Sequence, residues 1–367
     1  MPELTSITVQ GFKSIASITE LPLGPVNVVI GPNGSGKSNF IGAFSLLQAY
    51  RDGRLADFAA IAGGADRLLH FGAKQTPEIS IVVRFQDEDS QYSLALVAAA
   101  SDQLRLKSES LHRPGAGQAD YVKMLASSGR GPVAIESSTS SVLDSHMERH
   151  IERWRLYHFQ DASSSSPMKR TADIDDNRFL RPDGSNLSAL LYLLRVKYEA
   201  EYNLIRRTTQ LVAPFFDDFQ LEPLKLNPST IKLEWRHKNS DAYFDASSLS
   251  DGTLRFIALA TLFLQPEELR PSVILVDEPE LGLHPYAITL LASLIKQASV
   301  KTQVIVSTQS PRLVDNFEPE DIIVADLVNG ATELRRLKSD DLSSWLEEYS
   351  LGELWEKNQF GGRPGGS

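Results

Sequence analysis

The sequence predicts an α/β fold with a parallel-sheet core, a lobe of antiparallel β structure and a short helical insertion. A run of apolar residues at 25–30 leads into a glycine-rich loop at 31–38, and residues 39–50 carry apolar side chains at helical spacing. From residue 249 onward, helical and strand patterns alternate, which is typical of an α/β layer around a parallel sheet. Strand, glycine loop and helix therefore define the core, and the other segments are additions to it.

The additions follow from patterns elsewhere in the chain. Strand-like patterns crowd the first part, at residues 5–12, 26–30, 78–85, 92–97 and 104–110. Apolar residues at helical spacing over residues 187–212 predict a short helical insertion. We expect three parts: residues 1–160 with the glycine loop and the antiparallel β subdomain, residues 161–222 with a junction and the helical insertion, and residues 223–367 as the C-terminal lobe.

Composition excludes several classes of protein. A chain of 367 residues that is 42% hydrophobic and 23% charged is long and apolar enough to form one large domain or two lobes. It has no run of about 18 apolar residues, and its first residues lack the basic and apolar regions of a signal peptide. We therefore expect a cytoplasmic protein with no membrane anchor. Since cysteine is absent, disulfides, thiolate catalysis and thiolate metal sites are excluded.

Residues 31–38 read Gly-Pro-Asn-Gly-Ser-Gly-Lys-Ser and match the phosphate-binding pattern G-x-x-x-x-G-K-[ST] in full. Glycines allow consecutive backbone N–H groups to curl around phosphate oxygens, and the start of the following helix adds partial positive charge. Lys37 would supply a cation for the β- and γ-phosphates, and the Ser38 hydroxyl is suited to hold Mg²⁺. The sequence thus predicts that ATP binds with Mg²⁺ through Asn33, Gly34, Ser35, Gly36, Lys37, Ser38 and Asn39.

A second buried strand, residues 272–276, ends in Asp277-Glu278, the arrangement of a Walker B motif. An aspartate at this strand end can reach the Mg²⁺ shell, and the next glutamate lies where a general base would polarise the attacking water. We predict Asp277 as a metal ligand and Glu278 as a catalytic residue. An acidic turn after an ordinary strand is the alternative, and the complete phosphate loop upstream favours the Walker B interpretation.

The segment Leu249-Ser250-Asp251-Gly252 opens a helix that is apolar on nearly every side, although by itself it is also a good helix N-cap. The order of phosphate loop, this segment and a strand ending in Asp-Glu resembles the ABC-type ATPases. The resemblance implies an ABC-type ATPase head with a P-loop core. In that family the signature helix of one protomer caps the γ-phosphate held by another. Ser250 and Gly252 would therefore bind nucleotide across the interface of a homodimer that forms on ATP binding.

Two glutamines occupy further motif positions of this family. Gln160 follows the apolar strand 156–159, where ABC-type enzymes carry the glutamine loop that senses Mg²⁺ and the attacking water. The resemblance implies a metal-binding and catalytic role for Gln160. Gln309 follows the strand-like residues 304–308 at the switch position, where the family usually has a histidine. A glutamine amide can donate to the γ-phosphate, so a catalytic role is expected for Gln309, although the amide cannot become a cation.

Within the ABC-type enzymes the chain resembles the branch of RecF, the SMC heads and the OLD-like ATPases. The segments that carry this resemblance are residues 7–14, 183–187, 280–285 and 307–311. By the same analogy Lys13 and Ser14 would contact the nucleotide. A surface lysine and a serine at a strand end account for these two residues equally well.

The resemblance implies an enzyme that hydrolyses ATP and dimerises around Mg-ATP. Closure of the dimer would act either in a DNA transaction such as repair, or on a separate effector or nuclease subunit, as in bacterial defence against phage. Basic residues with interleaved aromatics at 149–170 and 195–207 are candidate DNA contacts, but the net charge of −10 and acidic neighbours favour a solvated face equally. A nucleotide-binding subunit of a membrane transporter and a nucleotide kinase are the alternatives, and a kinase leaves the Walker B and signature segments unexplained.

Overall fold

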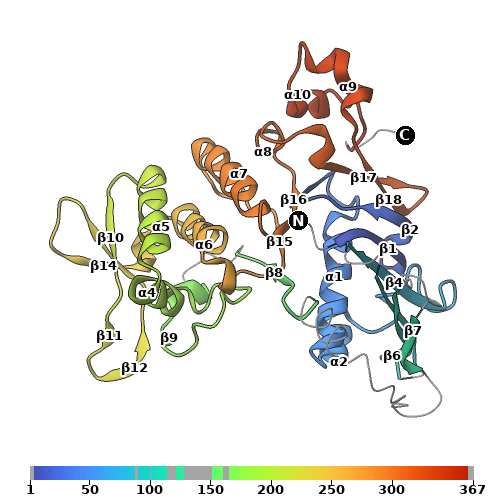
Figure 1. Cartoon of the computed structure of the whole chain (residues 1–367), viewed down its shortest axis with the longest axis horizontal. Helices are drawn as coiled ribbons and strands as arrows, with labels where there is room; N and C mark the ends of the chain where they lie inside the picture. The colour runs from blue at the N-terminus through green and yellow to red at the C-terminus, as the bar shows by residue number, and fades with distance from the viewer. Residues whose placement is uncertain are drawn as a thin grey trace. The chain divides into compact units, whose positions relative to one another are not determined.

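The chain folds into two compact units in the computed structural model, which describes residues 4–86, 90–99, 101–113, 121–127, 151–159 and 165–362 (Figure 1). The terminal unit combines residues 1–154 with 318–367, and the middle unit comprises residues 155–317. The boundaries predicted at residues 160 and 222 divide the chain into consecutive parts, whereas the terminal unit joins both ends of the sequence. Each unit is a mixture of helices and sheets, as the predicted α/β fold requires.

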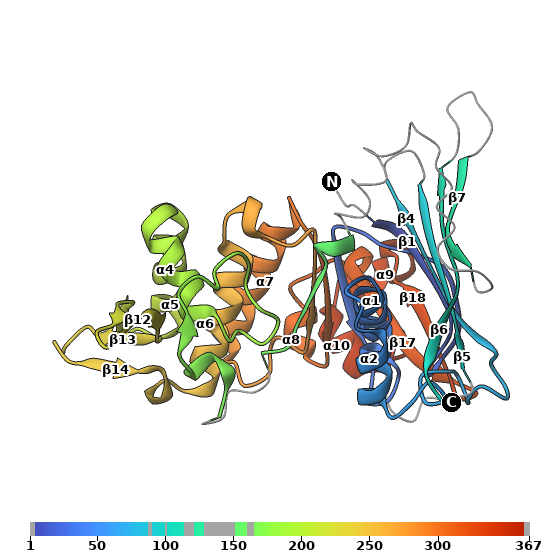
Figure 2. The same cartoon turned by 90° about the horizontal axis from the view of Figure 1, so that it is seen from below.

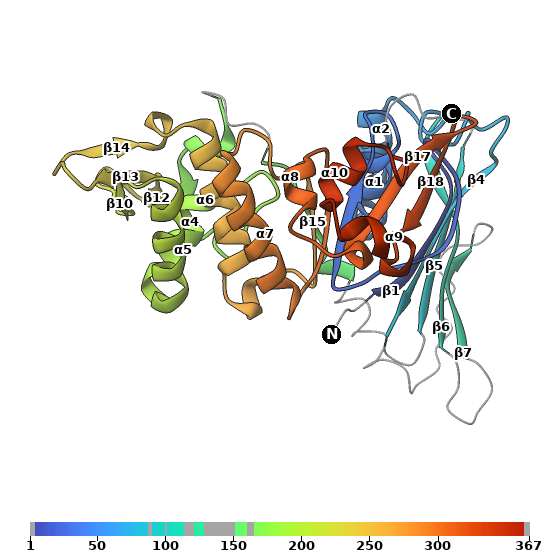
Figure 3. The ribbon, with the colours of Figure 1, turned by 90° about the horizontal axis from the view of Figure 1, so that it is seen from above.

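An antiparallel sheet forms much of the terminal unit. Its strand order is β2 (Ile15–Pro22), β1 (Leu4–Phe12), β4 (Glu78–Phe85), β5 (Gln91–Ala98), β6 (Leu104–Arg113) and β7 (Tyr121–Ser127). Every second side chain of β4 is buried, which is the alternation of a sheet that covers a core with one face. Figures 2 and 3 show a curved sheet with α1 (Lys37–Arg51) and α2 (Leu55–Ala62) on one side. The predicted antiparallel lobe is confirmed.

The phosphate loop lies in the terminal unit between β3 (Val26–Ile30) and α1. All five residues of β3 are buried, as a strand covered on both faces requires. Helix α1 buries Phe40, Ile41, Phe44 and Leu47 at the spacing predicted from the sequence. Strand β17 (Ile322–Val328) runs parallel to β3, and β18 (Ala331–Arg336) pairs antiparallel with β17. Further elements among the described residues of this unit are η5 (Pro319–Asp321), α9 (Ser339–Leu346) and α10 (Leu351–Glu356).

The middle unit has a core of parallel strands. β15 (Val273–Asp277) pairs with β16 (Gln303–Thr308) on one side and with β8 (Arg155–Tyr157) on the other. Helix α7 (Pro285–Ser299) connects β15 to β16, and α6 (Asp251–Leu264) packs beside α7, as Figure 3 also shows. In α6 the residues from 253 to 264 are buried, so its apolar pattern is that of a core helix.

The predicted helical insertion contains two helices, α4 (Leu187–Lys197) and α5 (Glu199–Val212), which are separated by Tyr198. Two small antiparallel sheets complete the middle unit. The strand order of the first sheet is β10 (Phe216–Gln220), β13 (Glu234–His237) and β14 (Tyr243–Asp245). The strand order of the second sheet is β11 (Pro223–Leu224), β12 (Asn227–Ile231) and β9 (Ala172–Asp173). The short helices are η2 (Pro167–Lys169), η3 (Ala246–Ser248), η4 (Glu267–Leu269) and α8 (Pro311–Val314). Across the described part of the chain, no helix combines the length and apolar character needed to cross a membrane.

Candidate nucleotide-binding and catalytic site

The phosphate loop has a backbone that only glycine accommodates at several positions. Gly34 and Gly36 have φ angles of 82° and 98°, in the left-handed region where a residue with a Cβ is strained. A Cβ on Gly36 would overlap Thr332 Oγ1, and one on Gly31 would overlap the Ala325 carbonyl oxygen. The loop is therefore pressed closely against β17 and β18.

The Lys37 side chain folds back onto this loop. It is 5% exposed, and its Nζ donates to the carbonyl oxygens of Gly31 at 2.7 Å and Pro32 at 2.9 Å. Ser35 Oγ is buried and has no hydrogen-bond partner among the atoms of the described residues. A lysine ammonium, a glycine-rich backbone and an unused hydroxyl in one loop fit a polyphosphate group. Ser38 is exposed in the first turn of α1, and its hydroxyl is an oxygen ligand of the kind that Mg²⁺ prefers.

Three side chains brace the loop through a chain of hydrogen bonds. Asn39 Nδ2 donates to Ser14 Oγ at 2.7 Å, the Ser14 and Thr332 hydroxyls lie 2.7 Å apart, and Thr332 Oγ1 donates to the Ser35 carbonyl oxygen at 2.9 Å. Because Thr332 has a single hydroxyl proton, Ser14 is the donor in the middle bond, so all three bonds run in one direction. Thr332 is 1% exposed, and its N–H donates to the Ser14 carbonyl at 2.7 Å. Ser14 and Thr332 thus position the phosphate loop.

Lys13 precedes this brace with a strained backbone, at a φ of 51°. Its carbonyl oxygen lies 2.8 Å from His70 Nδ1, and its Nζ lies 5.5 Å from the centre of the Phe12 ring. Burial lowers the pKa of the Lys13 ammonium. The Ser14 hydroxyl is already hydrogen-bonded to Asn39 and Thr332. Nucleotide contact by Lys13 and Ser14 therefore stays a prediction.

The predicted catalytic residues of the middle unit meet at the carboxyl ends of β15 and β16. Ser307 is in register with Asp277, and its hydroxyl donates to the Asp277 carboxylate. Glu278 has a φ of 47°, and its N–H donates to the Ser307 carbonyl at 2.9 Å. Gln309 Nε2 donates to the Glu278 carboxylate. The structure therefore brings Glu278 and Gln309 into direct contact.

Glu280 fixes the segment that carries Gln309. It is 8% exposed, and its Oε1 accepts hydrogen bonds from the Thr308 hydroxyl at 2.5 Å and from the Gln309 N–H at 3.2 Å. Its Oε2 is buried without a hydrogen-bond partner within the described residues, and burial raises the pKa of this carboxyl. In the sequence, Glu280 stood out only as the first residue of segment 280–285, which carries the family resemblance. Nothing in the local sequence indicated its contacts with Thr308 and Gln309.

The signature segment packs against the turn that follows the Walker B strand. Ser250 caps α6, with its Oγ accepting from the Thr253 N–H at 3.2 Å. A Cβ on Gly252 would overlap the carbonyl oxygen of Gly282, so glycine is required by this close approach. Ser250 and Gly252 therefore lie in the same unit as Glu278, while Lys37 and Ser38 lie in the other.

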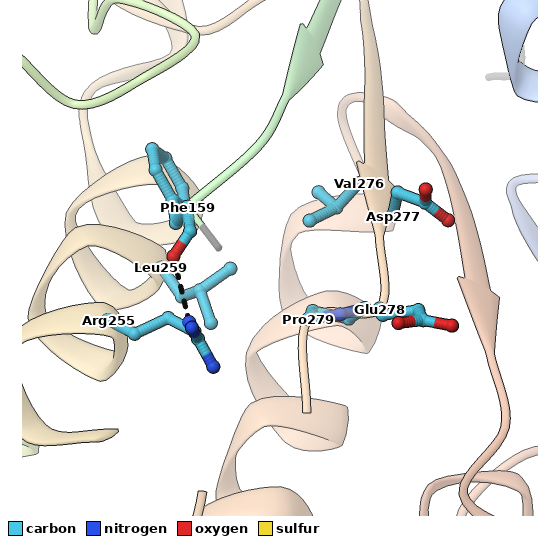
Figure 4. Close-up of a pocket in the computed structure, with 7 residues that line it drawn as sticks. All are labelled: Phe159, Arg255, Leu259, Val276, Asp277, Glu278 and Pro279. Carbon is cyan, nitrogen blue, oxygen red and sulfur yellow. Dashed lines mark hydrogen bonds between the residues drawn. The ribbon is translucent and has the colours of Figure 1, made fainter. Parts of the chain in front are cut away.

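Arg255 links the signature helix to two other segments of the middle unit. It is 8% exposed, its Nε donates to the Phe159 carbonyl at 2.8 Å, and its guanidinium also donates to the Leu281 carbonyl. Burial lowers the pKa of Arg255. Figure 4 shows Phe159 and Arg255 on one side of a small pocket, with the Asp277 and Glu278 carboxylates turned away from them; its other lining residues are Leu259, Val276 and Pro279. A single charge in the otherwise apolar stretch 253–264 is the sequence signal that could have identified Arg255.

Several predicted residues receive no support from the described structure. Gln160 lies outside the described residues, so its role stays a prediction. In the candidate DNA-binding clusters, Lys169 pairs with Asp251 at 3.2 Å and Arg206 with Asp218 at 3.6 Å. Within the described ranges, no group of three or more acidic or histidine side chains is placed to hold a metal ion.

The family of the chain follows from its sequence. A family model with the description "AAA domain, putative AbiEii toxin, Type IV TA system" matches residues 26–315, which is most of the chain. The chain belongs to this AAA-domain family. The matched range contains the phosphate loop, the signature segment, the Walker B strand and Gln309.

Several solved structures similar to this AAA-domain protein are heads of Smc proteins. An Smc head bound to the C-terminal winged-helix domain of ScpA matches with a TM-score of 0.62 at 20% identity, over 94% of this chain and all of that one. An Smc head with an extended coiled coil from Pyrococcus furiosus matches with a TM-score of 0.58 at 18% identity, over 95% and 99% of the two chains. At these identities the likeness concerns the fold alone, and the predicted fold of an ABC-type ATPase head is confirmed.

Curated relatives match over much shorter stretches. The chromosome partition protein Smc of Desulfitobacterium hafniense is 65% identical over 37 residues, which are 10% of this chain and 3% of that protein. Urease accessory protein 2 of Cryptococcus neoformans var. grubii is 32% identical over 133 residues, which are 34% of this chain and 11% of that protein. The chain thus aligns with only a small part of these two relatives, and its function is argued from its own site.

Proposed function

We propose that this chain binds and hydrolyses ATP with Mg²⁺, and that two copies close around two Mg-ATP molecules. The observation that carries the proposal is the phosphate loop, in which left-handed glycines, a buried lysine and an unused serine hydroxyl surround one stretch of backbone. On ATP binding, Lys37 Nζ exchanges the carbonyls of Gly31 and Pro32 for phosphate oxygens. Catalysis then consists of positioning and charge stabilisation, as in other phosphoryl-transfer enzymes.

Glu278 is the proposed general base, because it directly follows the Walker B aspartate. Its carboxylate would orient the attacking water, and the Gln309 amide, which already donates to it, would hold the carboxylate in place. Ser38 and Asp277 would hold Mg²⁺, with Gln160 as a further expected ligand. Bound Mg²⁺ would neutralise charge on the β- and γ-phosphates.

Dimerisation is proposed from the signature segment. Ser250 and Gly252 begin α6, where N–H groups at a helix start can donate to the γ-phosphate held by a second copy. Each site would then be complete only after closure, so ATP binding and dimerisation depend on each other.

Closure would act on DNA or on a separate effector subunit. The ion pairs of Lys169 and Arg206 reduce the positive charge available to a DNA backbone, which supports control of an effector. The description of the matched family names a toxin of a toxin–antitoxin system, which is consistent with control of an effector. If duplex or single-stranded DNA raises ATP turnover in a strongly salt-dependent way, the DNA alternative holds instead.

Glu278→Gln tests the proposal, since it keeps the shape of the side chain and removes the base. We expect phosphate release to fall by about 100-fold or more while Mg-ATP still binds and the variant accumulates as a dimer in light scattering. Glu267→Gln is the matched control, because Glu267 is exposed, forms a surface ion pair with exposed Lys301 at 3.2 Å, and lies outside the predicted site. A Glu278→Gln variant with parental turnover, or one that stays monomeric with Mg-ATP at high concentration, would contradict the proposal.

A further inference from the structure

Phe71 is a large apolar side chain held out into solvent. It is 61% exposed, and its φ of 54° lies in the left-handed region that a bulky residue rarely adopts. Both the exposure and the backbone conformation are unfavourable in the protein alone. Backbone strain of this kind concentrates at ligand-binding positions, where the surrounding structure maintains it.

The backbone around Phe71 is fixed by several contacts. His70 is 8% exposed, its N–H donates to the Gly11 carbonyl at 3.0 Å, and its Nδ1 lies 2.8 Å from the Lys13 carbonyl oxygen. The Thr76 hydroxyl donates to the His70 carbonyl at 2.5 Å. The His70 ring packs against Phe71, with 4.2 Å between ring centres and 55° between ring planes. These contacts therefore fix the position of the Phe71 backbone and ring.

Phe71 also lies next to the strand that braces the phosphate loop. Its Cζ would be 3.1 Å from a Cβ placed on Gly330, in the turn between β17 and β18. Two residues further along, Thr332 donates to the Ser35 carbonyl oxygen of the phosphate loop at 2.9 Å. Two residues of a strand span about 7 Å. A short stretch of β18 thus separates the exposed ring from the loop that would hold the phosphates.

We infer that Phe71 is the surface on which the base of the bound nucleotide stacks. The inference rests on the proposed binding of ATP at residues 31–38. A triphosphate held there leaves its ribose and base to lie along the neighbouring surface of the terminal unit, where Phe71 presents an aromatic face. Stacking uses the face of a base and not its edges. Phe71 therefore favours nucleotides over inorganic polyphosphate, and purines, with their larger faces, over pyrimidines.

Calorimetry with Mg-ATP and with inorganic tripolyphosphate tests the inference on the full chain. Phe71→Ala should raise the Kd for ATP about tenfold and leave the Kd for tripolyphosphate unchanged. Ile61→Ala is the matched control, because Ile61 is 89% exposed on α2 of the same unit; both of its affinities should equal those of the parent. Equal ATP affinity of Phe71→Ala and the parent would overturn the inference.

Phe71→Trp gives a second readout that does not depend on activity. After subtraction of the signal from the four native tryptophans, ATP should quench the added fluorescence and tripolyphosphate should not. Identical responses to both ligands would also overturn the inference. Lys37→Ala separates this result from failure of the proposed function. If this variant binds ATP and tripolyphosphate as tightly as the parent, ATP binding at the phosphate loop is refuted. If the variant loses affinity for both ligands, ATP binding at the phosphate loop is supported.

Discussion

Thr332→Val removes one hydroxyl from the brace of the phosphate loop and keeps the shape of the side chain. The parent hydroxyl donates to the Ser35 carbonyl at 2.9 Å and accepts from Ser14 at 2.7 Å, and Thr332 is 1% exposed. Water therefore cannot replace the partner of the Ser35 carbonyl without entering the core, whereas the bond to Ser14 is only partly buried. The substitution leaves Ser35 O and Ser14 Oγ each with one hydrogen bond fewer.

The size of the effect follows from these two bonds. A buried hydrogen bond contributes about 1 kcal/mol net and a partly buried one less, so the free energy of unfolding should fall by about 1–2 kcal/mol. Loss of these bonds also removes a restraint on the loop at Ser35. Part of the binding free energy must then be used to order the loop when ATP binds. We expect the Kd for Mg-ATP to rise by up to about tenfold, which corresponds to 1.4 kcal/mol.

Denaturant unfolding and calorimetry with Mg-ATP measure the two effects separately. Thr261→Val is the matched control: Thr261 is fully buried, and its hydroxyl donates only to the Ile257 carbonyl one turn earlier in α6, at 2.8 Å, among the contacts described. It should lose stability without losing ATP affinity. If Thr332→Val destabilises the protein and still binds ATP as the parent does, Thr332 contributes to folding alone and the reasoning about the loop is refuted.

Two further substitutions test the middle unit. Burial raises the pKa of Glu280 above its unfolded value of 4.5, so its contribution to stability is present below pH 4.5 and is lost as the pH rises through the folded value. In denaturant unfolding, Glu280→Gln should therefore gain stability relative to the parent as the pH rises above 4.5, and a difference independent of pH would contradict this. Gly252→Ala should lower the thermal midpoint, because its Cβ would overlap the Gly282 carbonyl and overpacking costs about 1–3 kcal/mol. Gly42→Ala in α1 is the control, since its Cβ would make an ordinary 3.5 Å contact with Phe12 and helix propensity favours alanine over glycine by about 1 kcal/mol. Equal thermal midpoints for Gly252→Ala and Gly42→Ala would refute the reasoning about the overlap at Gly252.

The core elements could be predicted because short stretches of sequence determine them. The predicted strand 25–30 corresponds to β3, the predicted helix 39–50 to α1, and the predicted strand 272–276 to β15, each within two residues. The interruption of the predicted helix 187–212 at Tyr198 could not be predicted in this way. Tyr198 has a φ of −134°, and its hydroxyl donates to the Glu268 carboxylate, 70 positions away in the sequence. Such a contact leaves no local pattern.

The supporting residues of the site were hidden from the sequence for the same reason. Ser35 and Thr332 are 297 positions apart and meet only because β18 pairs with β17, which in turn pairs with β3. Glu280 reaches Thr308 because β15 and β16 run in parallel register. Sequence motifs identify groups that would touch a ligand, since ligand chemistry restricts the residue type there. The groups that support them are determined by strand pairing across the fold.

The contact between Gln309 and Glu278 gives the departure from histidine a physical meaning. A protonated histidine at this position would place a cation beside the Glu278 carboxylate and weaken it as a base. A glutamine amide donates to the carboxylate while staying neutral at every pH. Its NH₂ group has two protons, so one can donate to Glu278 while the other serves a phosphate oxygen. In the proposed mechanism Gln309 thus joins the base to the triphosphate without a titrating group at the switch position.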